Sequence, residues 1–142
     1  MSLNTDSEID QRRSTLTTVA NPDRAIDYII TLSGRLIIEG LSEPIRYRIR
    51  YVPDQVILDA RSMADYAAVV RGQPWPSFEE AALALNADFH DRTVPRWVEI
   101  YCETRRPGDA RVSSESVYSI ILSERQPDWN NPTLLARLRR DG

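Results

Sequence analysis

The sequence contains no lysine, one cysteine and one histidine among its 142 residues. All 18 basic residues are arginine, which excludes Schiff-base chemistry, a lysine general base and a lysine-containing phosphate-binding loop. Cys102 alone cannot form an intrachain disulfide, and with His90 it supplies too few ligands for a His/Cys zinc site within one chain. We therefore expect no bound metal.

Long apolar segments are also missing. No run approaches the roughly 18 apolar residues that span a bilayer, and the N-terminus has no apolar signal-peptide segment. We therefore expect a cytoplasmic protein without a membrane partner. The formal net charge of −3 argues against direct nucleic-acid binding. With 42% apolar and 27% charged residues, the chain has the composition of one globular domain.

Two predicted strands precede a helical middle. Residues 25–40 are rich in β-branched residues and predict a strand that is bent or bulged at Ser33–Gly34. After the turn "LSEP", residues 45–52 read "IRYRIRYV" and alternate strictly, which predicts the second strand of a hairpin. One face of this strand carries Ile45, Tyr47, Ile49 and Tyr51, and the other carries Arg46, Arg48 and Arg50.

The arginine face has two interpretations. It is a charged surface in water, or it lines the tunnel of a closed barrel and pairs there with acids such as Glu99 or Glu103.

Two helices and a second pair of strands follow. Residues 62–71 predict a helix that ends at Gly72, and residues 77–92 predict another. The apolar face of the second helix consists of Phe78, Ala82, Leu85 and Phe89, and Ser77 with Glu80 forms an S-x-x-E capping box. Residues 96–104 and 110–124 predict two further strands, with Cys102 on an apolar core face.

The predicted architecture is an α+β domain with the order ββααββ. A four-stranded antiparallel sheet would carry two helices on one face. We expect a flexible arm over residues 1–21, the domain over 22–125, and a tail over 126–142 with a short helix after Asn131–Pro132. Because four strands leave two open edges, we expect a homo-oligomer that pairs these edges into a barrel.

Several short motifs resemble one family. Residues 51–66, "YVPDQVILDARSMADY", resemble a "YVPD" strand end followed by "VELKSLKLY" in the NADPH-dependent 7-cyano-7-deazaguanine reductases of the queuosine pathway, which have the tunnelling fold (T-fold). Ser62 and Tyr66 match that motif, while Asp59 replaces its glutamate and Arg61 its first lysine. "FEEA" at 78–81 and "PRWVEI" at 95–100 resemble two further family motifs, and the likeness extends over residues 25–123.

The likeness fails at the family's catalytic segment. There the reductases have "C-P-x-T-G-Q-P-D", in which the cysteine forms a thioimide and the aspartate supplies a proton. In register, Leu36 or Ile37 stands at the cysteine position and Glu43 at the aspartate position. An aliphatic side chain cannot be a nucleophile, so Glu43 remains as the candidate for proton transfer. The resemblance assigns no role to Cys102.

The resemblance implies a set of site residues. Glu80 would accept the N–H and amino hydrogens of a guanine-like ring, and Glu79 would do so if the register is shifted by one residue. Ser62 and Arg61 would contact a ring substituent or a cofactor phosphate. Arg106 and Gly108 would contact NADPH. Each has an ordinary structural alternative, such as a cap for Glu80 and Ser62 or a plain turn for the last two.

Three functions remain open from the sequence. The first is an oligomeric T-fold protein that binds a 7-deazaguanine-, purine- or pterin-like heterocycle, with reductase ancestry, NADPH as the cofactor if reduction survives, and no thioimide route. The second is a non-catalytic binding or scaffold subunit. The third is a cofactor-independent T-fold enzyme that uses carboxylates. T-fold enzymes that depend on zinc ligands or a lysine are excluded by composition.

Overall fold

The structure is a computed structural model that describes residues 5–106 and 116–141. It is an α+β protein with two antiparallel sheets, and its main sheet has the strand order β2-β3-β5-β6. The strands of this sheet are β2 (Ile30–Leu36), β3 (Ile45–Val52), β5 (Trp97–Arg106) and β6 (Ser116–Arg125). The small sheet pairs β1 (Thr18–Ala20) with β4 (Val56–Leu58). The helices are α1 (Asp6–Thr15), α2 (Ser62–Arg71), α3 (Phe78–Thr93) and α4 (Pro132–Asp141).

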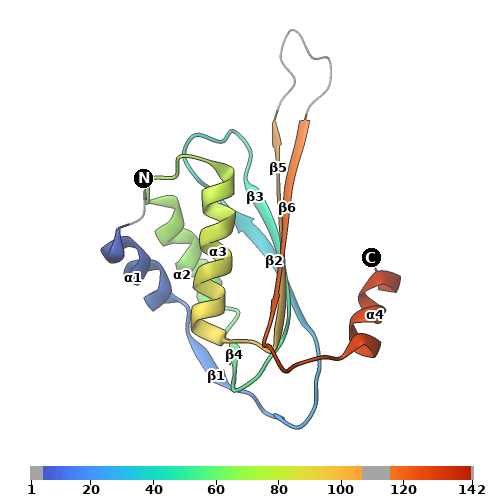
Figure 1. Cartoon of the computed structure of the whole chain (residues 1–142). Coiled ribbons are helices and arrows are strands. Elements are labelled where there is room, and N and C mark those ends of the chain that lie inside the picture. The colour runs from blue at the N-terminus through green and yellow to red at the C-terminus, as the bar shows by residue number, and fades with distance from the viewer. Residues whose placement is uncertain (1–4, 107–115, 142) are drawn as a thin grey trace.

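The helices lie on both sides of the main sheet. Figure 1 shows α1, α2 and α3 together on one side, whereas α4 lies on the other side. No helix in the described part of the chain is long and apolar enough to cross a membrane. The described strands form an open sheet rather than a barrel, with β2 and β6 at its edges.

Side-chain alternation decides which sheet face is buried. The apolar residues of β3 are at most 7% exposed, as are Val98, Ile100 and Cys102 of β5. They pack against the face of α3 that carries Phe78, Ala82, Leu85 and Phe89, all buried as predicted. The hairpin of β2 and β3 pairs without a bulge, from Ile30 opposite Tyr51 to Leu36 opposite Ile45.

The N-terminal region differs from the predicted flexible arm. Residues 6–15 form α1, whose N-cap Thr5 and Glu8 make a reciprocal capping box, and residues 18–20 form β1. Leu16 is fully buried, and Arg12 is only 2% exposed. Although the segment has few apolar residues, polar contacts to α2 and α3 hold it in place, and no local pattern signals such contacts.

Candidate functional site

The first candidate group lies at the start of α3. Ser77 is the N-cap, and its hydroxyl oxygen accepts the backbone N–H of Glu80 at 3.2 Å. The predicted capping box is only half formed, because the Glu80 carboxylate makes no hydrogen bond or ion pair within the described residues. Glu80 is half-buried and Glu79 exposed. Both acids are in the first turn, where the helix dipole stabilises a negative charge.

A cavity of about 50 Å³ joins this helix start to the connection between β2 and β3. Its lining comprises Ile38, Glu39, Gly40, Leu41, Trp75, Pro76, Ser77 and Phe78. The first four belong to the segment 36–43, which stands where the reductases have their catalytic motif. Figure 1 shows the same proximity between this connection and the first turn of α3. The cavity is far below the roughly 300 Å³ of a small-molecule site, so a fused ring would have to lie outside it.

No thiol nucleophile is available beside this cavity in the described residues. Leu36 is buried in the core at 1% exposure, and Ile37 is 49% exposed. Cys102 is on the inner sheet face, as predicted, and burial raises the pKa of its thiol to about 12. Glu43 is exposed, and its backbone oxygen accepts a bond from the hydroxyl of Thr104 at 3.4 Å.

Ser62 and Arg61 lie away from Glu80. The hydroxyl of Ser62 donates to the backbone oxygen of Asp59 at 2.7 Å and accepts the backbone N–H of Thr17 at 3.2 Å. Ser62 is therefore buried and engaged in fastening the N-terminal segment. It is not the N-cap of α2, because that position belongs to Arg61. Arg61 has a side chain 93% exposed and pairs with Asp59 at 3.3 Å.

The direction of the helices explains this separation. Figure 1 shows α2 and α3 running in opposite directions, so their N-termini lie at opposite ends of the helical layer. One copy of the chain therefore does not bring Ser62 and Arg61 to Glu80. Of the residues predicted to contact NADPH, Arg106 is the last residue of β5 and pairs with Ser116, and Gly108 lies outside the described residues.

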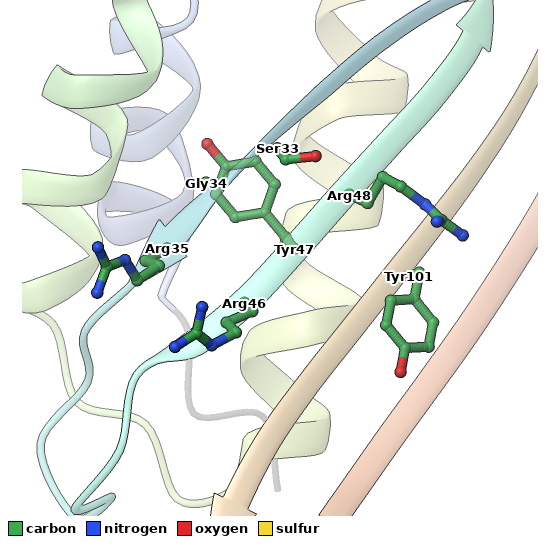
Figure 2. Close-up of a pocket in the computed structure, with 7 residues that line it drawn as sticks. All are labelled: Ser33, Gly34, Arg35, Arg46, Tyr47, Arg48 and Tyr101. Atoms are coloured by element: carbon green, nitrogen blue, oxygen red, sulfur yellow. The ribbon is translucent and has the colours of Figure 1, made fainter. Parts of the chain in front are cut away.

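A second group, not predicted as a site, lies on the main sheet. Figure 2 shows its residues, which come from β2, β3 and β5 and line a cavity of about 400 Å³: Ser33, Gly34, Arg35, Arg46, Tyr47, Arg48 and Tyr101. By strand alternation Ser33, Arg35, Arg46, Arg48 and Tyr101 share the outer face of the sheet, whereas Gly34 and Tyr47 belong to the inner face, where Tyr47 is part of the core. Sequence alternation predicts the arginine stripe of β3. What alternation alone does not reveal is that β2 adds Arg35 and β5 adds Tyr101, since this depends on strand register.

The strand register also determines which arginines the acidic residues of β5 face. Glu99 lies opposite Arg50, and Glu103 lies opposite Arg46, the two acids that the sequence suggested as partners of the stripe. The Glu103 carboxylate accepts a bond from the hydroxyl of Tyr101 at 3.0 Å and lies 4.0 Å from the Nε of Arg105. Burial and the proximity of Glu103 raise the pKa of Tyr101.

A third group is buried between α1, α2 and α3. The Asp88 carboxylate accepts bonds from Arg12, Arg13 and Tyr66 at 2.7, 2.9 and 2.6 Å, and the Nη1 of Arg12 donates to Gln73 at 2.8 Å. Burial, followed by the charge of Asp88, holds the pKa of Tyr66 well above its usual value. With Asp88 fully buried, this group is a structural clasp rather than a ligand site.

The described residues contain no group of three or more His, Cys, Asp or Glu side chains placed to hold a metal ion. No protein-family model matches the sequence, and no curated protein matches it.

Proposed function

We propose that this chain is a T-fold-like protein that assembles with copies of itself and binds a guanine-like fused heterocycle through Glu80, without covalent catalysis. The carboxylate of Glu80 carries the proposal: it is partly exposed, at a helix start, and unpaired within the described residues. A carboxylate can accept two parallel hydrogen bonds from adjacent N–H groups, which is the edge that guanine presents.

The arrangement of the main sheet supports the proposal at the level of topology. Two hairpins, β2–β3 and β5–β6, flank α2 and α3, and the four strands are neighbours in that order. The main-sheet strands and these two helices follow one another along the chain as β, β, α, α, β, β, with β4 inserted before α2 and with α1, β1 and α4 outside that order, which supports the proposal. The edge strand β6 carries large exposed apolar side chains, with Val117 57% and Ile121 61% exposed. Unpaired edges with apolar side chains favour pairing with another chain.

Assembly would also bring together predicted site residues that lie apart within one copy of the chain. Arg61 and Ser62 stand at the start of α2, and Glu80 is in the first turn of α3. Because these helices run in opposite directions (Figure 1), Ser62 and Arg61 could reach the ligand of Glu80 only from a neighbouring copy. The cavity at the start of α3 is too small for a fused ring, which likewise favours a site that a second copy completes.

The environment of the thioimide position favours binding over reduction. Leu36 fills the core, and the single thiol, Cys102, is buried on the inner face with a raised pKa. If any catalysis remains, Glu43 is the acid nearest in sequence to that position, and NADPH would be the reductant. Because no thiol stands at the thioimide position, these residues favour a binding subunit without turnover over a reductase.

Calorimetric titration of the full-length protein with guanine and 7-cyano-7-deazaguanine tests the proposal. Glu80→Gln should weaken binding by about tenfold or more, because it removes a charged acceptor of two hydrogen bonds. Glu79→Gln is the matched control, since it removes the same charge from the adjacent, exposed residue, and it should change affinity less than about twofold.

Two further measurements separate the alternatives. Light scattering should show an oligomer, and a stable monomer that still binds would overturn the assembly part. Addition of NADPH with 7-cyano-7-deazaguanine should give no consumption of NADPH. Steady consumption would instead identify a reductase that works without a thioimide, and equal affinity of both variants would overturn the role of Glu80.

A further inference from the structure

The outer face of the main sheet brings three arginines, Arg35, Arg46 and Arg48, to the lining of one cavity. Arg35 of β2 lies directly opposite Arg46 of β3, and Arg48 is two residues further along the same face. Like charges directly opposite each other destabilise a sheet. A cross-strand arginine pair at the wall of a cavity therefore has a cost that a bound anion would remove.

None of these three arginines forms an ion pair with an acid in the described residues. Within residues 5–106 and 116–141, no carboxylate lies within 4.0 Å of the guanidinium nitrogens of Arg35, Arg46 or Arg48. Although Glu103 is opposite Arg46, its carboxylate is engaged by the hydroxyl of Tyr101 and lies near Arg105.

Arg48 shows an unmet hydrogen-bond requirement. Its Nε is buried and has no hydrogen-bond partner. Its guanidinium lies over the ring of Tyr101, 5.6 Å from the ring centroid, which holds the planar group in place. Figure 2 shows Arg48 extending towards Tyr101, with Arg35 and Arg46 on neighbouring strands at another part of the same cavity. Buried donors in proteins are nearly always satisfied. Because the Nε is itself inaccessible, an anion in the cavity would meet the terminal nitrogens of the Arg48 guanidinium rather than the Nε.

We propose that this cleft, lined by Arg35, Arg46, Arg48, Ser33 and Tyr101, binds the phosphate group of a small molecule. Guanidinium groups present planar pairs of N–H donors that match the oxygens of phosphate, and Ser33 adds a hydroxyl. The volume of about 400 Å³ is within the range of small-molecule sites. The net charge of −3 disfavours a nucleic-acid backbone as the source of the phosphate.

The cleft is independent of the heterocycle site. By strand alternation its arginines project from the sheet face opposite the one that packs against α3, the helix to which Glu80 belongs. The test therefore uses ribose 5-phosphate, which carries no heterocycle, as the main probe in calorimetry with the full-length protein. Inorganic phosphate and ribose are the companion probes. Ribose should not bind, and Glu80→Gln should leave the affinity for ribose 5-phosphate unchanged.

The discriminating variants are Arg46→Gln and Arg71→Gln. Arg46→Gln should lower the affinity for ribose 5-phosphate by about tenfold, because one charge-assisted contact is lost. Arg71, exposed at the end of α2, undergoes the same change in charge away from the cleft and should alter affinity less than about twofold. Thermal unfolding checks folding, and Arg35→Gln serves as a second variant if Arg46→Gln fails to fold.

The outcomes of these titrations either support or overturn phosphate binding in the cleft. Equal binding of inorganic phosphate and ribose 5-phosphate, both sensitive to Arg46→Gln, supports the cleft with the free ion as its ligand. Absence of binding by every phosphate compound would overturn the proposal, as would equal loss in Arg46→Gln and Arg71→Gln. Tight binding of a single-stranded oligonucleotide without binding of ribose 5-phosphate would also overturn it. So would dissociation of an oligomer by Arg46→Gln without any phosphate binding, because the arginines would then contact a second copy.

Discussion

Arg12 of α1 donates from its Nε to the Asp88 carboxylate of α3 across 2.7 Å, and the two side chains are only 2% and 0% exposed. The guanidinium also lies over the ring of Trp75, 5.1 Å from its centroid. These contacts join two elements 76 residues apart in the sequence. They explain why a polar N-terminal segment forms part of the folded domain.

Replacing Asp88 by Ala should lower the free energy of unfolding by about 3–5 kcal/mol, because Arg12 would be left buried with an uncompensated charge. Urea denaturation measures this change. Asp91→Asn is the control. The Asp91 side chain is 47% exposed and, among the described residues, pairs only with Arg13, at 3.4 Å, so this substitution should change the free energy of unfolding by no more than about 0.5 kcal/mol. A loss below about 1 kcal/mol for Asp88→Ala would contradict a clasp that holds α1 to α3.

Replacing Gly34 by Ala should destabilise the β2–β3 hairpin. A Cβ atom at this position would approach the Tyr47 ring closely, with the ring's Cζ only 2.7 Å away. Overpacking of this kind costs about 1–3 kcal/mol, measurable by thermal or urea unfolding. The double variant Gly34→Ala with Tyr47→Leu should lose less free energy of unfolding than the two single variants lose in sum. Simple additivity would show that the ring and the new methyl group do not meet.

Cys102 should resist alkylation in the folded protein. Burial raises its pKa to about 12, so the thiolate is scarce at pH 8, and the thiol is only 1% exposed. A thiol-reactive dye should label the native protein slowly and the urea-unfolded protein at the rate of a free cysteine. Rapid labelling of the native state would show an accessible thiolate and would reopen the question of a covalent mechanism.

Asp27 should make stability dependent on pH at the acid end. Burial opposes its ionisation, but hydrogen bonds from Asn131, Arg96 and Trp129 together lower its pKa. A carboxyl with a lowered folded pKa contributes stability above its unfolded pKa of about 3.9 and loses it as the pH falls through the folded value. The difference in unfolding free energy between wild type and Asp27→Asn should therefore be constant from pH 7 to about 5 and shrink below about 4.

The control for that experiment is Asp128→Asn, because Asp128 is exposed on the segment that leads to α4. Its unfolding curve should follow the wild type at every pH. A difference between wild type and Asp27→Asn that does not change with pH would show that Asp27 acts through its shape rather than its charge.

Much of the fold could be predicted from local patterns. The alternation "IRYRIRYV" predicted the buried and arginine faces of β3, and the apolar spacing of 78–89 predicted the buried face of α3. Both patterns work because the repeat of a strand or helix decides which side chains share a face. The core position of Cys102 followed from the same reasoning and is confirmed.

The candidate sites were less predictable, because they depend on which segments meet. Nothing local indicates that Ser62 bonds to Thr17, 45 residues away, or that α2 and α3 run in opposite directions and so begin at opposite ends of the helical layer. The predicted capping box was half right, since an S-x-x-E pattern fixes the backbone bond to Ser77 but leaves the glutamate side chain free to turn outward.

Residue periodicity thus predicted the strands of the main sheet, α2 and α3, together with their buried faces, but not α1 or β1. Folding in three dimensions decided the rest: the docking of α1 through Arg12, the pairing of Arg35 with Arg46, and the engagement of Glu103 by Tyr101. The physical reason is that hydrophobic period and helix capping act between near neighbours in the chain. Strand register and buried polar contacts join residues far apart, whose meeting depends on the packing of the whole domain.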